Sequence, residues 1–149
     1  MGLPPQKFRE IVVQLLYSRD FGPIDAQECT PFMMRELKVT RRTMAEVHHR
    51  IDQILAKCPE IDPMIEEASL SYAFQRISNV EKAILRWGAF ELLFDASLAG
   101  SIIITEAIRL TRKFASPEGA RFVHAILSAI QVYVQRKQSA EHTNASVAL

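Results

Sequence analysis

Apolar residues recur at the spacing of an α-helix along most of this chain, and no stretch alternates convincingly in the manner of a β-strand. In the first segment, Phe8, Val12 and Leu15 lie on one helical stripe. The 149 residues are enough to bury the core of one ordinary domain without a metal or a disulfide. The sequence therefore predicts an all-α fold of about seven helices, over residues 5–18, 30–37, 40–58, 62–75, 79–94, 102–115 and 117–136.

Capping residues mark the ends of these predicted helices. Ser78 and Glu81 form a capping box, in which each residue satisfies a free backbone amide of the other. The helix that they open, 79–94, is apolar round most of its circumference, so we expect it at the centre of the domain. Pro59 is expected to close the helix that Thr40 opens, because proline interrupts the hydrogen bonding of a helix interior. Three more predicted N-caps each precede a proline: Thr30, Asp62 and Ser116.

Composition excludes several classes of protein. The chain has 18 Lys and Arg against 17 Asp and Glu, a net charge of +1, which excludes a histone-like basic protein and a disordered acidic one. No apolar stretch approaches about 18 residues, and the N-terminal segment lacks the pattern of a signal peptide. Two cysteines, Cys29 and Cys58, indicate no disulfide framework. We expect a cytoplasmic protein with no membrane association, one domain over residues 1–137 and a flexible tail over 138–149.

Catalytic motifs are missing from the sequence. There is no GxSxG, Walker, HExxH or CxxC motif, and five glycines leave little material for a phosphate-binding loop. The neighbours His48 and His49 point about 100° apart on a helix and cannot chelate one metal. We interpret His48 as a packing histidine with a hydrogen-bonded ring rather than a ligand, and Glu91 as a buried acceptor rather than an acid or base, although its partner is not identifiable. We therefore expect no enzyme, no cofactor and no metal.

Positive charge is concentrated near the C-terminal end. Residues 109–137 carry six Lys and Arg and a single acid, Glu118. Among the cations, Arg109, Arg112 and Lys113 lie opposite the apolar face of their predicted helix. Two interpretations stay open for this face. It is either a solvated surface that complements the negative end of the helix dipole, or a surface for a polyanion such as nucleic acid.

Two aromatic residues break the pattern of a simple core. Tyr17 projects with Glu10 and Lys7 away from the apolar stripe of the first helix, which favours an exposed contact surface. Phe122 lies at the border of the apolar arc of the last helix, next to Arg121. An aromatic ring beside an arginine can stack an unpaired RNA base, but the same pattern also fits a core residue.

Four stretches of the sequence carry a more specific pattern. The most specific runs from Val80 to Arg86 and is followed by Phe90-Glu91-Leu92; the others are 8–17, 104–114 and 121–127. Together these stretches resemble the NusB family of bacterial transcription antitermination factors. The resemblance covers about residues 7–20 and 76–130, whereas 25–74 matches only in helical pattern.

The resemblance implies both a fold and a function. Proteins of the NusB family are all-helical domains of two packed bundles, which bind the boxA element of nascent RNA jointly with NusE, a small-subunit ribosomal protein. They act within the antitermination complex on RNA polymerase. Carried over position by position, the resemblance implies that Lys7, Arg9, Arg121 and Phe122 contact RNA and that Tyr17 and Glu81 contact NusE.

The sequence also departs from the family pattern. Family members often carry an arginine run at the N-terminus, where this chain has Pro4-Pro5-Gln6, and His124-Ala125 replaces the usual Asn-Gly. Fewer phosphate contacts predict a weaker salt dependence of RNA binding. An alternative is therefore a helical protein-interaction module with a weakened RNA face. A third interpretation is an enzyme relative, since the NusB-like fold also occurs fused to ribosomal RNA cytosine methyltransferases; we do not expect it, because 149 residues leave no room for that catalytic domain.

Overall fold

The protein is all-helical over the residues that its computed structural model describes, 3–21, 31, 34–70, 74–95 and 97–147. No strand occurs among these residues, which confirms the predicted fold class. Residues 34–37 are helical, as expected, whereas the predicted cap Thr30 lies outside the described residues. The elements are α1 (Pro5–Ser18), η1 (Arg19–Phe21), α3 (Arg41–Ala68), η2 (Phe74–Arg76), α4 (Asn79–Phe94), α5 (Gly100–Phe114) and α6 (Pro117–Val147), where η denotes a short 3-10 turn.

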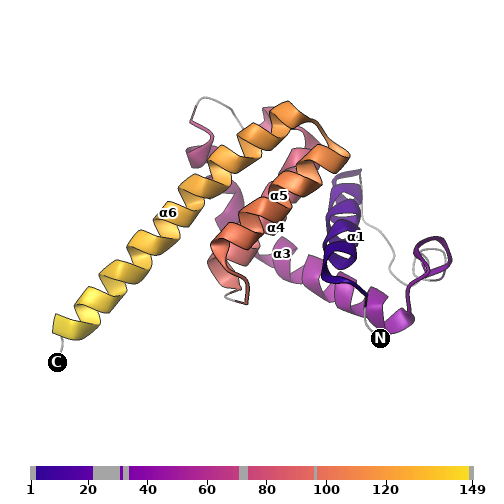
Figure 1. Cartoon of the computed structure of the whole chain (residues 1–149), viewed down its shortest axis with the longest axis horizontal. Helices are drawn as coiled ribbons and strands as arrows, with labels where there is room; N and C mark the ends of the chain where they lie inside the picture. The colour runs from indigo at the N-terminus through magenta and orange to yellow at the C-terminus, as the bar shows by residue number, and fades with distance from the viewer. Residues whose placement is uncertain (1–2, 22–30, 32–33, 71–73, 96, 148–149) are drawn as a thin grey trace.

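Helix α4 is the centre of the molecule (Figure 1). Helices α1 and α3 contact each other and α4, and α5 and α6 contact each other and α4, so α4 joins two packed groups of helices. The predicted capping box is present, since the backbone amide of Glu81 donates to the Ser78 hydroxyl over 3.2 Å. Trp87, in the middle of α4, is only 1% exposed. The predicted bounds and the central position of this helix are both confirmed.

Helix α3 corrects two of the predicted boundaries. It runs without a break through Pro59 and Pro63, so Pro59 does not close it, and it ends at Ala68 rather than near residue 75. Both prolines lie on the exposed side, where water can hydrogen-bond the carbonyl groups that they leave free. On the opposite side, Ile61 and Ile65 are fully buried and hold the helix against the core. Two predicted helices therefore form one, and the number of helices is slightly lower than expected.

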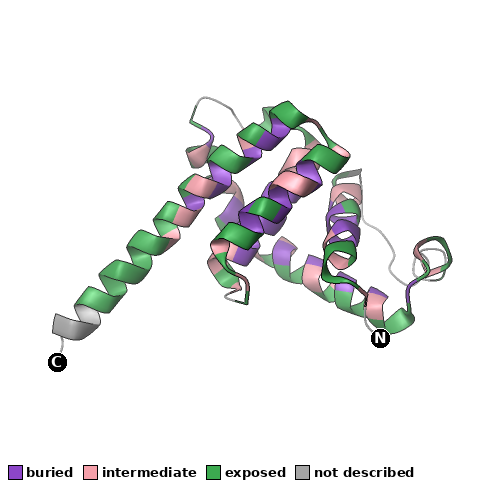
Figure 2. Ribbon diagram, viewed as in Figure 1, coloured by how far each residue is buried: buried purple, intermediate pink, exposed green. Residues whose placement is uncertain are grey.

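Helix α6 is longer than its sequence pattern predicts. It continues to Val147, so the expected end near Arg136 is wrong (Figure 1). Residues 135–143 are exposed, and this part of the helix extends past the rest of the bundle (Figure 2). No glycine or proline occurs between residues 120 and 147 to end the helix. The flexibility of residues 138–149, and their separation from a domain over residues 1–137, stay predictions.

Candidate nucleic-acid interface

Two buried carboxylates lie between α1 and α5. Glu10 is 7% exposed and Glu106 is 5% exposed. Arg109 links them, because its Nε donates to Oε2 of Glu106 over 2.6 Å and its Nη1 donates to Oε1 of Glu10 over 2.8 Å. Burial alone would favour the neutral carboxyl groups, but hydrogen bonds from Arg109 to both, with Lys113 at Glu10 and Arg9 at Glu106, outweigh it and lower the pKa of each. Both carboxylates are therefore ionised near neutral pH.

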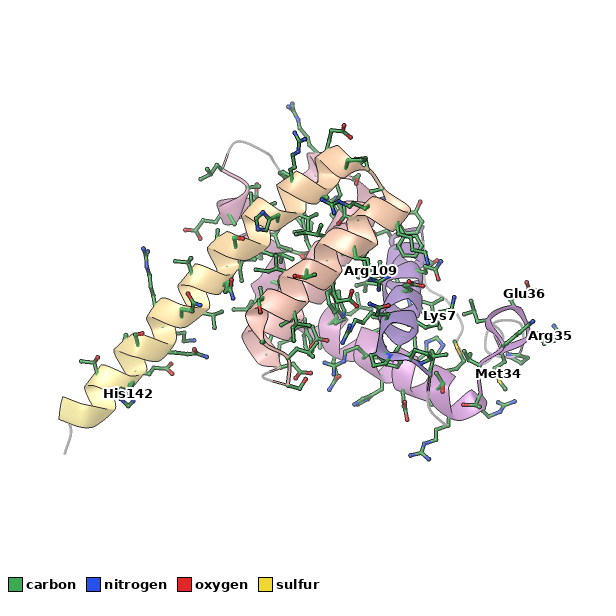
Figure 3. The ribbon with its side chains drawn as sticks, in the orientation of Figure 1. Lys7, Met34, Arg35, Glu36, Arg109 and His142 are labelled. Atoms are coloured by element: carbon green, nitrogen blue, oxygen red, sulfur yellow. The ribbon has the colours of Figure 1, made fainter. Side chains whose placement is uncertain are left out.

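Glu10 also contacts two lysines, one from each of the two helices. Lys113 of α5 donates from Nζ to Oε1 of Glu10 over 3.1 Å, and Nζ of Lys7, one turn earlier in α1, lies 4.0 Å from Oε2. Figure 3 shows Lys7 and Arg109 at the seam between α1 and α5. The expectation that Glu10 projects into solvent is wrong. Likewise, Arg109 is not a freely solvated cation, because it is paired with both carboxylates.

Arg9, predicted to contact RNA, is engaged inside the protein. Its Nη1 donates to Oε1 of Glu106, and its side chain is 15% exposed. No pattern in the sequence indicated this pair, because the two residues are 97 positions apart. The local signals for the network were the i, i+3 spacings of Glu106 with Arg109 and of Lys7 with Glu10, which are typical of ion pairs along a helix. The role of Arg9 in RNA binding stays a prediction.

The opening turns of α4 and α6 lie side by side near the other predicted contacts. One oxygen of Glu81 accepts a hydrogen bond from the Ser78 hydroxyl over 2.5 Å. The other lies so close to Gly119 that a Cβ added there would approach it to 2.6 Å. A carboxylate at this place complements the positive end of the α6 dipole. Glu81 therefore sits beside the first turn of the helix that carries Arg121 and Phe122.

The two aromatic residues, Tyr17 and Phe122, are both half-buried. Tyr17 packs against the core from the last turn of α1, so the expectation that it projects away from the apolar side is wrong. Phe122 is half-buried and also packs against the core, whereas its neighbour Arg121 is exposed. The interpretation of Phe122 as a core residue therefore holds in part, and its interpretation as a ring that stacks an RNA base stays open. The contacts of these residues with RNA or a partner stay predictions.

Arg86 of α4 contacts side chains of three other elements. It donates from Nε and Nη2 to the two oxygens of Asp62 over 3.0 and 2.9 Å, and from Nη1 to Asp20 over 3.3 Å. It also lies 5.3 Å from the centre of the Phe74 ring, which Lys82 covers at 4.7 Å. These contacts join α4 to α3, η1 and η2. Arg86 is thus a structural cation with two acidic partners.

The structure arranges the four predicted RNA contacts on two helices. Lys7 and Arg9 belong to α1, and Arg121 and Phe122 belong to α6. Helix α5 connects the two places, because it packs against α6 and its cations reach Glu10 of α1. The exposed cations of α5 therefore extend the surface that α1 begins.

The relationship to known proteins agrees with this architecture. The sequence model of the NusB family matches residues 6–132 of the chain, which include all six predicted contact residues. The chain belongs to the NusB family. "Transcription antitermination protein NusB" of Chlamydia pneumoniae is 35% identical over 127 residues, which cover 85% of this chain and 79% of that protein. The NusB protein of Helicobacter acinonychis is 33% identical over 129 residues, covering 87% and 93%.

A solved NusB structure has the same fold. The crystal structure described as "Antitermination Factors NusB and NusE in complex with dsRNA" superposes with a TM-score of 0.73 at 24% identity, covering 86% of this chain and 96% of that one. The NusB family model ends at residue 132, inside α6, so the last turns of that helix lie beyond the family match.

A second polar region of this NusB-family chain lies between α1, α3 and the end of α4. A hollow of about 750 Å³ is lined by charged residues of both signs, including Arg9, Arg50 and Glu91. Glu91 is buried, and burial raises its pKa although Nη1 of Arg50 lies 3.9 Å away. Arg50 donates more closely to Asp95, over 2.9 Å. Arg50 is thus the charged partner of Glu91 that the sequence did not identify; Glu91 is buried as we expected, and its role as a hydrogen-bond acceptor stays a prediction.

His48 differs from its interpretation as a hydrogen-bonded packing residue. Among the described residues, neither of its ring nitrogens has a hydrogen-bond partner, although both are buried. Burial, with a contribution from the charge of Arg19, lowers its pKa, so the ring is neutral. Within the described part of the chain, no group of three or more His, Cys, Asp or Glu residues could hold a metal ion. No described helix is long and apolar enough to cross a membrane.

Proposed function

We propose that this chain is an RNA-binding transcription antitermination factor. It binds boxA-type RNA of ribosomal RNA operons together with NusE and forms part of the scaffold of the antitermination complex on RNA polymerase, without catalysing a reaction. Relatives above 30% identity are named as antitermination proteins, and a structure with the same fold contains NusE and RNA. One observation of this chain carries the proposal: an exposed Arg121 beside a half-exposed Phe122 in the opening turns of α6.

The chemistry of the predicted contacts is consistent with this function. Lys7 and Arg121 are exposed cations that can neutralise phosphates, and the accessible side of Phe122 can stack a base. Tyr17 and Glu81 are proposed to contact NusE. Glu81 offers a carboxylate, which suits a basic ribosomal protein.

A titration of RNA with and without NusE tests the proposed function. We expect boxA-type single-stranded RNA to bind more tightly when NusE is present, because the two proteins then share one RNA surface. Scrambled RNA of the same composition, and a double-stranded RNA of the same length, serve as controls measured by fluorescence anisotropy at fixed salt. The proposal fails if NusE adds no affinity for boxA-type RNA over the scrambled sequence.

Replacement of Phe122 by alanine separates RNA binding from the alternative function. Loss of one stacked base lowers RNA affinity by about 1–3 kcal/mol, roughly 5- to 150-fold. Phe94→Ala is the matched control, since Phe94 is 40% exposed at the far end of α4 and should leave RNA affinity unchanged. Circular dichroism should show that both variants remain folded.

The alternative is a helical protein-interaction module with a weakened RNA face. One observation favours it: Arg9, one of the few cations left near the N-terminus, is occupied by Glu106. In that case Phe122→Ala and the wild type would bind RNA equally weakly, whereas binding of NusE would be retained.

A further inference from the structure

The carboxylate of Glu10 holds two half-exposed ammonium groups next to each other. Nζ of Lys7 lies 4.0 Å from one of its oxygens, and Nζ of Lys113 lies 3.1 Å from the other. The lysine side chains are 48% and 52% exposed, whereas that of Glu10 is 9% exposed. The negative charge is therefore buried beneath two positive charges that face the solvent. The lysines belong to different helices, so only the tertiary structure, in which α1 and α5 both pack on α4, brings them together.

Glu10 is itself fixed in position by the interior of the protein. Arg109 donates to the same oxygen that Lys113 contacts, over 2.8 Å, and is held in turn by Glu106. The second Nη of Arg109 reaches the backbone carbonyl of Gln6 at 3.5 Å, so α1 is tied to α5 through its backbone as well. A carboxylate held in this way reduces the number of conformations open to the lysines that it contacts, which lowers the entropy lost when they bind a ligand.

The charge of this cluster favours an anion. Four cations, Lys7, Arg9, Arg109 and Lys113, share two carboxylates, those of Glu10 and Glu106, which leaves a net charge of +2. The two arginines are largely occupied by the carboxylates. A lysine ammonium has three donors, and Glu10 uses at most one from each lysine, so both lysines keep donors for a further acceptor.

We propose that Lys7 and Lys113 form a phosphate-binding site for the RNA backbone, with Glu10 as the positioning residue that sets their spacing. The proposal rests on the proposed RNA-binding function and extends the RNA surface across α5, toward the first turns of α6. It also decides between the two interpretations of the cationic face of α5. Lys113 contacts a polyanion there, whereas Arg109 supports the site from inside.

The salt dependence of RNA binding tests the two lysines. Each contact with a phosphate of single-stranded RNA contributes about 0.7 to the slope of log affinity against log salt. Because the two lysines share one phosphate, we expect the double variant Lys7→Gln/Lys113→Gln to reduce the slope for boxA-type RNA by about that amount and each single variant to reduce it by a part of that amount, whereas Lys113→Arg should keep the slope of the wild type. Lys137→Gln removes the same charge from the exposed far part of α6 and should leave the slope unchanged. Inorganic phosphate, added at constant ionic strength, shows whether the site takes a free anion as well.

The outcomes distinguish this proposal from the function on which it rests. If Lys113→Gln has the slope of the wild type while the wild type still prefers boxA-type RNA with NusE, the two-lysine site is wrong and the proposed function stands. If the wild type shows no such preference, the proposed function itself fails. If Lys137→Gln lowers the slope as much as Lys113→Gln does, the effect is one of net charge alone and the site is again wrong.

A double-mutant cycle tests the positioning role of Glu10. Two lysines that bind one phosphate act together, so Lys7→Gln and Lys113→Gln combined should lose less affinity than the product of their separate losses. In a Glu10→Gln background, the losses of affinity caused by Lys7→Gln and Lys113→Gln should become independent of each other. Removal of the acid also raises the net charge, so the binding of scrambled RNA should be retained. If Glu10 had a purely structural role, Glu10→Gln would lower the affinity for boxA-type RNA and for scrambled RNA alike. The coupling between the two lysine substitutions would then be preserved. Should Glu10→Gln not fold, additive losses in the wild-type background would overturn the shared site, and coupled losses would support it.

Discussion

Arg109→Leu is expected to lower the free energy of unfolding by about 3 kcal/mol, the loss typical of removing one partner from a buried ion pair. Arg109 is the link between two carboxylates that are almost inaccessible to water, Glu10 and Glu106. Without it, Lys113 and Arg9 each retain one carboxylate, but the hydrogen bonds of 2.6 and 2.8 Å are lost. The remaining oxygens are then buried with fewer donors, which destabilises the folded state.

Urea denaturation at neutral pH measures this loss, and Arg112→Leu provides the matched control. Arg112 lies on the same helix three positions away and is exposed, so its replacement should change stability by less than about 0.5 kcal/mol. Equal effects of the two substitutions would show that the network between α1 and α5 contributes nothing specific to stability.

The pH dependence of stability gives a second measure of the same network. The pKa of Glu10 and of Glu106 is lowered in the folded protein from the ordinary value of 4.5, so the unfolded state binds more protons below that pH. The stabilisation from these carboxylates is complete above about pH 4.5 and is lost as the pH falls through their folded pKa values. Arg109→Leu removes a main cause of the lowered pKa. The difference in the free energy of unfolding between Arg109→Leu and the wild type should therefore become smaller as the solution is acidified from pH 6 to below about pH 4.

Local sequence signals, such as helix caps, predicted much of the fold because their contacts lie within one turn of a helix. Ser78 and Glu81 are three positions apart, and the capping box they form sets the start of α4 wherever the helix packs. Pro59 misled the prediction, because the effect of a proline depends on which side of the helix it faces. That side is decided by the burial of Ile61 and Ile65 against the rest of the core. The end of α6 was also misplaced, since a polar helix without glycine or proline carries no stop signal.

For the candidate site, the sequence predicted the exposure of two cations but not the contacts among the charged side chains. The resemblance to the NusB family placed Lys7 and Arg121 on the surface, and both are exposed. No periodicity within α1 could show that Glu10 would be buried, because its partner Arg109 is 99 positions away. A charged residue opposite an apolar stripe normally faces water, and here the packing of a second charged helix overrides that rule. The ion pairs that join α1 to α5 are thus properties of the tertiary structure.

Trp87→Ala is expected to have the largest effect on stability, a loss of about 3–5 kcal/mol from an emptied core position. The ring is 1% exposed on the helix that contacts α1, α3, α5 and α6, so its removal weakens the packing of both helical groups at once. The position also lines the hollow that contains Arg9 and Glu91, and water entering from there would reach the core. For a protein of this size, the melting temperature should fall by roughly 6–20 °C.

Circular dichroism at 222 nm is the suitable measurement, because Trp87 is the single tryptophan and the variant has no tryptophan fluorescence. Ile102→Ala is the control on a neighbouring helix. Ile102 is 47% exposed, so its truncation should change stability by less than about 0.5 kcal/mol. A Trp87 variant as stable as the Ile102 variant would mean that α4 is not the common support of the two helical groups. The direct contacts of α3 with α6, together with the ion pairs between α1 and α5, would then have to join the two groups without it.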